Sequence, residues 1–187
     1  MQEAEYMSET SRYRNLTTKY CYRADSQPGC GIDIASQGDP VVSWAWQLDL
    51  PHDQFAHYNS NYPPRGPIQL RADGTHHAGS EPNSLDFVYS SHLLEDNLEE
   101  DWDRIFSLWS SMLKPGGYLI ILVPERNLWA AAIAAGQSPN CSHKFEPLVG
   151  DMSRHAQAIG LEVIEERLTN CHPGDYTILG VFRKALQ

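Results

Sequence analysis

The sequence predicts an α/β protein with a mostly parallel sheet, and two segments carry most of this prediction. Ser84–Glu95 begins as a buried strand, and Tyr118–Val123 is a second run of strand length and high apolarity. Between them lie an amphipathic stretch and the turn residues Pro115-Gly116-Gly117. Strand, helix, glycine turn and strand make a βαβ unit, so the ligand site is expected at the carboxyl ends of parallel strands.

Seven segments have strand character, and the last two are joined by a short loop that makes them antiparallel. The expected strands are 30–35, 43–49, 67–72, 85–89, 118–123, 161–168 and 176–182. Helices are expected at 11–20, 97–114, 126–136 and 148–160. Only about eight residues separate the first two strands, whereas a crossover usually needs a dozen or more. The first crossover helix is therefore predicted to be missing or reduced.

The helix at 97–114 has the clearest periodicity. Apolar residues from Trp102 to Leu113 follow i, i+3, i+4, i+7 spacing, Asp96 or Asn97 is expected to cap the helix, and Pro115–Gly117 to end it. The neighbouring acids, from Glu95 to Asp103, are interpreted as a solvated helix start. Trp44 and Trp46 are expected in the core, with a place in the roof of a substrate pocket as the alternative.

Composition narrows the function classes. The 187 residues carry a net charge of −10 without a basic cluster, which disfavours a nucleic-acid partner. No apolar run approaches a membrane span and no secretion signal is visible, so a cytoplasmic protein with four free cysteines is expected. Cys141, His143, Cys171 and His172 match no common zinc module, and no metal site is predicted.

Three acids occur at or near the ends of three successive strands: Asp33, Asp49 and Asp73. A carboxylate that ends the second strand can accept both ribose hydroxyls, and one that ends the third can meet an adenine amino group. Aspartate is also common at strand ends because it favours turns. Three in order favour a pocket for an adenosine-bearing ligand.

Five segments together resemble the class I S-adenosylmethionine-dependent methyltransferases, most closely the small bacterial type 11 group. They are Gly31–Gly38, Gln47–Asp49, Arg71–Thr75, Leu85–Glu95 and Leu113–Pro124. The resemblance covers roughly residues 29 to 183. It implies a Rossmann-like three-layer sandwich whose seven-stranded sheet has an antiparallel last strand, and S-adenosylmethionine as cofactor. Residues 1–28 are then an N-terminal polar segment or lid, and residues 29–187 the methyltransferase domain.

The resemblance also implies a cofactor site. Asp33, Ala35 and Gly38 would line the methionine part, Asp49 and Leu50 would hold the ribose, Asp73, Gly74 and Thr75 would meet the adenine edge, and Ser90, Ser91 and His92 would form the floor near the methyl group. The first loop departs from the family pattern, because Asp33-Ile-Ala-Ser-Gln-Gly38 keeps one loop glycine and places Ala35 where the backbone normally approaches the cofactor.

His92 and His143 are the candidate catalytic bases, since an imidazole titrates near neutrality. A hydrogen-bonded structural role for His92 and an exposed loop position for His143 are the alternatives. The predicted activity is methyl transfer to O, N or C of a small molecule, whose pocket would come from the N-terminal segment, residues 51–66 and residues 125–147. Oligomeric state is left open, with a homodimer as one option.

Two other functions compete with this prediction. The first is a non-catalytic module that binds cofactor or a partner through the altered first loop. The second is a nucleotide-sugar or NAD-type enzyme, which the missing G-x-G-x-x-G motif and the missing Tyr-x-x-x-Lys proton donor disfavour. Product formation separates the enzyme from the first, and ligand identity separates it from the second.

Overall fold

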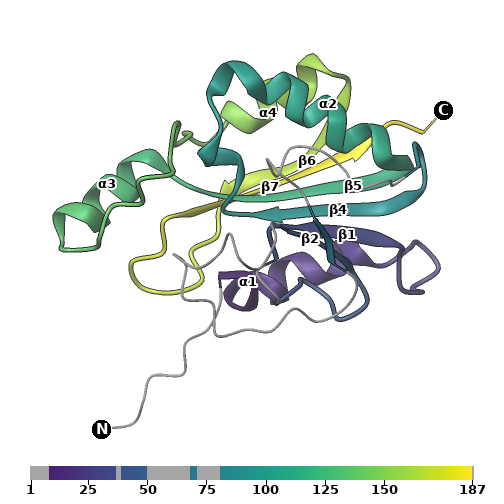
Figure 1. Cartoon of the computed structure of the whole chain (residues 1–187), viewed down its shortest axis with the longest axis horizontal. Coiled ribbons are helices and arrows are strands. Elements are labelled where there is room, and N and C mark those ends of the chain that lie inside the picture. Colours follow the sequence, from purple (N-terminus) through teal and green to yellow (C-terminus); the bar gives the residue numbers. More distant parts are fainter. Residues whose placement is uncertain (1–8, 37–38, 50–67, 71–80, 187) are drawn as a thin grey trace, which may run out of the picture.

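A seven-stranded sheet organises the chain in the computed structural model, which describes residues 9–36, 39–49, 68–70 and 81–186 (Figure 1). The strands are β1 (Gly31–Ile34), β2 (Trp46–Asp49), β3 (Ile68–Leu70), β4 (Leu85–Ser91), β5 (Leu113–Pro124), β6 (Leu161–Leu168) and β7 (Thr177–Lys184). Their order across the sheet is β3-β2-β1-β4-β5-β7-β6. The first five pair in parallel and β7 is antiparallel to both of its neighbours, which confirms the predicted sheet.

Helices cover both faces of this sheet. In Figure 1, α2 and α4 lie over one face, α1 lies against the other, and α3 extends from the carboxyl end of β5. The helical elements are α1 (Glu9–Thr17), η1 (Thr18–Cys21), η3 (Leu94–Asp96), η4 (Glu99–Asp101), α2 (Trp102–Met112), α3 (Arg126–Ala134) and α4 (Asp151–Ala158). The described residues between β1 and β2, 35–36 and 39–45, form turns and bends without a helix, as the short spacing predicts.

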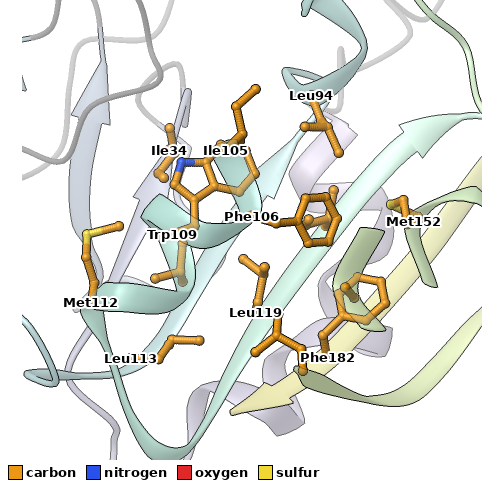
Figure 2. Close-up of a cluster of buried hydrophobic side chains, with 14 of the residues drawn as sticks. Ile34, Leu94, Ile105, Phe106, Trp109, Met112, Leu113, Leu119, Met152 and Phe182 are labelled. Atoms are coloured by element: carbon orange, nitrogen blue, oxygen red, sulfur yellow. The ribbon is translucent and has the colours of Figure 1, made fainter. Parts of the chain in front are cut away.

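The core divides into two layers because side chains alternate along the strands. Val88, Leu119 and Ile121 face α2 and α4 and belong to the larger cluster. Figure 2 shows Leu119 of this cluster together with Trp109 and Phe182. On the other face, the smaller cluster joins strand residues to α1 and to the segment that follows β1. Its buried members are Tyr13, Cys21, Val41, Val42, Ala45, Phe87, Tyr89, Ile120, Leu122, Leu179 and Val181.

Two predictions about the βαβ unit are wrong in their boundaries. Neither Asp96 nor Asn97 caps α2, which begins at Trp102 after the short 3-10 helix η4 and has no side-chain cap. Pro115–Gly117 does not end the helix either, because α2 stops at Met112 and β5 already begins at Leu113. Gly116 takes the left-handed φ of 81° that this path requires.

The two tryptophans near β2 are also not core residues. Trp44 is 37% exposed and Trp46 is 46% exposed. Trp44 lies just before β2 and Trp46 is its first residue, so both directly follow the segment in which the first crossover helix is missing. Trp44 packs edge-on against Tyr22, with ring centroids 5.3 Å apart.

Among the described helices, none is long and apolar enough to cross a membrane.

Candidate functional site

The carboxyl ends of β2, β1 and β4 lie side by side, and they carry most of the described candidate residues. Ile34 pairs with Leu48 on one side and with Ser90 on the other. Asp49 and Ser91 each follow these partners by one residue, so both stand at the same edge of the sheet. Gly38, Leu50, Asp73, Gly74 and Thr75 lie outside the described residues.

The first loop leaves β1 through a left-handed residue. Ala35 has φ 64°, a conformation that costs an L-residue with a Cβ about 1–2 kcal/mol and that glycine adopts freely. Its N–H donates to the Leu48 carbonyl at 2.8 Å, which ties the start of the loop to β2. The next residue, Ser36, is buried and its hydroxyl bonds Gln47 Oε1 at 3.1 Å. Alanine thus holds the backbone path that glycine usually takes.

Replacing Ala35 with glycine is expected to stabilise the protein slightly and to tighten cofactor binding. Relief of the left-handed strain outweighs the extra unfolded-state entropy of glycine by about 0.5 kcal/mol. Loss of the methyl group also lets a ligand approach the backbone more closely. Urea unfolding and calorimetric titration with S-adenosylhomocysteine would measure both effects. Weaker binding by the glycine variant would show that the alanine methyl group contributes to the site.

Asp33 holds the segment after the first loop through a hydrogen bond made inside the core. Its side chain is fully buried, and Oδ2 accepts the N–H of Val41 at 2.6 Å. Burial, and after it the charge of Asp33, raise the pKa values of the Cys21 thiol and the Tyr89 hydroxyl. Both groups therefore stay protonated at neutral pH, and neither serves as a nucleophile beside β1.

The end of β4 combines buried hydroxyls with a strained histidine. Ser90 and Ser91 are both buried, and Ser90 Oγ has no hydrogen-bond partner among the described residues. His92 then takes the left-handed φ of 53°, while its N–H donates to the Leu122 carbonyl at 2.9 Å. Such conformations cost about 1–3 kcal/mol and cluster at functional sites. His92 is therefore a functional candidate on backbone grounds as well as by its chemistry.

The two candidate histidines converge on one carboxylate that the sequence interpretation missed. His92 Nδ1 lies 3.5 Å and His143 Nε2 lies 3.7 Å from Oε1 of Glu95, whose side chain is fully buried. His143 Nδ1 also lies 3.0 Å from Glu146 Oε1. The interpretation of Glu95 as part of a solvated helix start is wrong, because the loop carrying His143 covers it.

His143 is not an exposed loop residue. Its side chain is 6% exposed, and its ring lies 5.2 Å from that of Trp129 in α3. Trp129 packs edge-on against Tyr176 at 4.9 Å, and Tyr176 in turn meets the His92 ring at 6.4 Å. The aromatic rings thus join the end of β4, the helix after β5 and the start of β7 around the two imidazoles.

Next to this cluster, Asp96 titrates in an unusual range. Burial, followed by the negative charge of Glu95, raises the Asp96 pKa to about 6. The folded state therefore binds the Asp96 proton more tightly than the unfolded state does. This contribution to stability is complete below about pH 4 and is lost as pH rises through about 6.

Asp96→Asn is expected to make the protein more stable than the wild type above pH 7. The asparagine removes a penalised charge, and because Asp96 is only partly buried we expect a gain of about 1 kcal/mol after solvent screening. The difference should shrink as pH falls towards 4, where the wild-type carboxyl is neutral. Urea unfolding at pH 4, 6 and 8 measures it. A difference independent of pH would contradict the assignment.

No group of three or more His, Cys, Asp or Glu side chains suited to a metal ion occurs among the described residues. The four cysteines are free thiols.

The order and directions of the strands define a Rossmann-like α/β protein. Residues 27–121, just over half of the chain, match the family described as methyltransferase domain. The chain belongs to this family and is a class I S-adenosylmethionine-dependent methyltransferase by domain. S-adenosylmethionine is accordingly its cofactor. No protein of curated function gives a significant sequence match.

Solved structures share the fold at low sequence identity. A Pyrococcus horikoshii protein matches with a TM-score of 0.67 and 15% identity over 98% of this chain and 92% of its own. A Burkholderia thailandensis 1,6-didemethyltoxoflavin-N1-methyltransferase, solved with 1,6-didemethyltoxoflavin and S-adenosylhomocysteine, has a TM-score of 0.65 and 12% identity, over 95% and 80% of the chains. A Mesorhizobium loti S-adenosylmethionine-dependent methyltransferase has a TM-score of 0.60 and 16% identity, over 83% and 91%.

The described residues fit this cofactor. The left-handed turn at Ala35 brings backbone to the edge of the sheet, and β2 ends there with an aspartate. Two buried polar atoms near the same edge, Gln47 Nε2 and Ser90 Oγ, have no hydrogen-bond partner among the described residues. Groups of this kind suit a ligand that carries hydroxyl, amino and carboxylate functions.

Proposed function

We propose that the protein transfers the methyl group of S-adenosylmethionine to a small-molecule acceptor. The observation that carries the proposal is the convergence of His92 and His143 on the buried Glu95, directly after the serines that end β4. When bound, the cofactor supplies a methyl group activated by its sulfonium. The chain then has to hold an acceptor in line with that group, and alignment of this kind supplies about 7–11 kcal/mol.

We assign the cofactor-binding role to Asp49 at the end of β2, the backbone of the first loop, and Ser90 and Ser91. His92 is the proposed base when the acceptor must lose a proton, and Glu95, 3.5 Å from its Nδ1, orients the ring. His143 approaches the same carboxylate oxygen through Nε2 and contacts Glu146 through Nδ1. In this proposal residues 29–187 are the methyltransferase domain and residues 1–28 an N-terminal polar segment or lid.

Production of S-adenosylhomocysteine tests the proposal. The protein would be incubated with S-adenosylmethionine and a panel of small phenols, amines and activated carbon acids, and the product followed by mass spectrometry. Turnover of at least one acceptor is expected, with a large loss in His92→Asn and unchanged cofactor affinity. Equal turnover by His92→Asn would remove the histidine from the mechanism.

Ala35 favours a second candidate, a non-catalytic module that binds the cofactor or a partner. The alanine replaces the loop glycine at a left-handed position, where close approach of a ligand is hardest to keep. Cofactor binding without turnover of any acceptor would support this module over the enzyme.

A further inference from the structure

Helix α1 is hydrogen-bonded to the three residues that directly follow the first loop. The Arg14 guanidinium donates from Nη2 to Asp39 Oδ1 at 2.6 Å and to the Pro40 carbonyl at 3.0 Å, and from Nε to the Val41 carbonyl at 3.2 Å. Ser11 Oγ donates to Asp39 Oδ2 at 2.5 Å. One planar side chain therefore bonds three consecutive residues, which the fork of a guanidinium does better than the single ammonium of lysine.

The same segment is held from the opposite side by β1. Asp33 Oδ2 accepts the Val41 N–H at 2.6 Å, so Val41 is bonded at its carbonyl by Arg14 and at its amide by Asp33. Val41 is also fully buried beneath α1 in the smaller core cluster. The segment that directly follows the first loop is thus held between a helix and a strand, and we call this set of contacts, which includes Arg14, the clamp.

The clamp takes the place of the crossover helix that is missing after β1. In a usual βαβ unit, the helix after the first strand begins at the loop and fixes it next to the ligand. Here residues 39–45 form turns and bends without a helix. Figure 1 shows α1 on the face of the sheet opposite α2 and α4, near β1 and β2. The N-terminal helix therefore fixes the loop from outside the βαβ unit.

A second anchor holds α1 without Arg14. Tyr13, which is 3% exposed, donates its hydroxyl to Asp175 Oδ1 at 2.9 Å and shares a hydrogen bond of 2.8 Å with Thr177 Oγ1. These contacts tie the helix to the loop before β7 and to the strand itself. Loss of Arg14 should free the first loop while α1 stays docked.

We propose that Arg14 is a positioning residue for the cofactor: through Asp39, Pro40 and Val41 it presets the glycine-poor first loop and thereby raises affinity for S-adenosylmethionine and S-adenosylhomocysteine. This inference rests on the proposed cofactor site. A loop already held in its binding conformation loses less entropy when the ligand arrives, so more of the contact energy becomes affinity.

Calorimetric titration with S-adenosylhomocysteine tests the clamp in Arg14→Gln, Arg14→Lys and Arg12→Gln. Arg12 is an exposed arginine on the same helix, so its variant is the control for charge and helix propensity. We expect Kd to rise about tenfold in Arg14→Gln, less in Arg14→Lys, and to stay at the wild-type value in Arg12→Gln. Hydrogen exchange of the ligand-free protein should be faster at residues 39–45 in Arg14→Gln than in the wild type, and unchanged in Arg12→Gln.

Thermal unfolding separates positioning from general stability, because a simple structural role would lower the Tm without a selective change in Kd. If Arg14→Gln does not fold, Asp39→Asn replaces it as the test from the other end of the ion pair. Unchanged Kd in a folded variant, with tight binding by the wild type, would overturn the clamp and leave the cofactor site standing. Failure of the wild type to bind would overturn the cofactor site and the clamp together.

Discussion

Gly31→Ala is expected to destabilise the fold by about 3 kcal/mol, because the added methyl group overlaps a neighbouring side chain in a close-packed core. A Cβ at position 31 would lie 2.3–2.4 Å from three ring carbons of Phe87, its partner across the β1–β4 ladder. Phe87 is fully buried in the smaller core cluster. Either β1 or the ring must move, and both support the loop that begins at Ala35.

Urea unfolding of Gly31→Ala, Phe87→Leu and the double variant tests this explanation. Each single change is expected to destabilise, the first by overlap and the second by a cavity. The double variant should be more stable than the sum predicts, since leucine vacates the space that the new methyl group needs. Gly180→Ala is the comparison, because its Cβ would lie 2.9 Å from Met152 Cε and from two Phe182 ring carbons, a smaller overlap than at position 31, and it should therefore destabilise less. Strictly additive effects would rule out the ring as the cause.

The sheet could be predicted because its signals are local. Strand β4, helix α2 and strand β5 each carry their own periodicity, and the short spacing after β1 excludes a crossover helix without any knowledge of the fold. The helix boundaries were predicted less accurately. The start of α2 is delayed to Trp102 by the 3-10 helix η4, which Asp96 and Asn97 do not reveal.

The site depends on contacts that no local pattern encodes. Glu95 lies in a run of acids and reads as solvated, yet the segment carrying His143, nearly fifty residues later, buries it. Its i, i+3 spacing from His92 is the one signal that could have pointed to the pair. Arg14 and Asp39 are likewise separated by 25 positions. Trp44 and Trp46 look like core residues from their apolar character alone, yet both are exposed.

Asp49→Ala is expected to lower affinity for S-adenosylhomocysteine by about 100-fold or more, since two charge-assisted hydrogen bonds to ribose hydroxyls are worth about 1.5–3 kcal/mol each. Asp49 ends β2 next to the turn at Ala35, whose N–H bonds the preceding residue, Leu48, at 2.8 Å. Asp49→Asn keeps one acceptor and loses the charge, so its affinity should fall between those of the wild type and the alanine variant.

A ligand without the 2′-hydroxyl identifies the contact more sharply than the variants alone. Wild type should bind 2′-deoxy S-adenosylhomocysteine more weakly than the parent ligand, whereas Asp49→Ala should bind both with similar affinity, because it lacks the carboxylate proposed to accept that hydroxyl. Asp25→Ala, at an exposed aspartate, controls for the change in net charge. If deoxygenation weakens binding equally in wild type and Asp49→Ala, the ribose is held elsewhere, and the carboxylate that ends β2 acts on the site only through its charge.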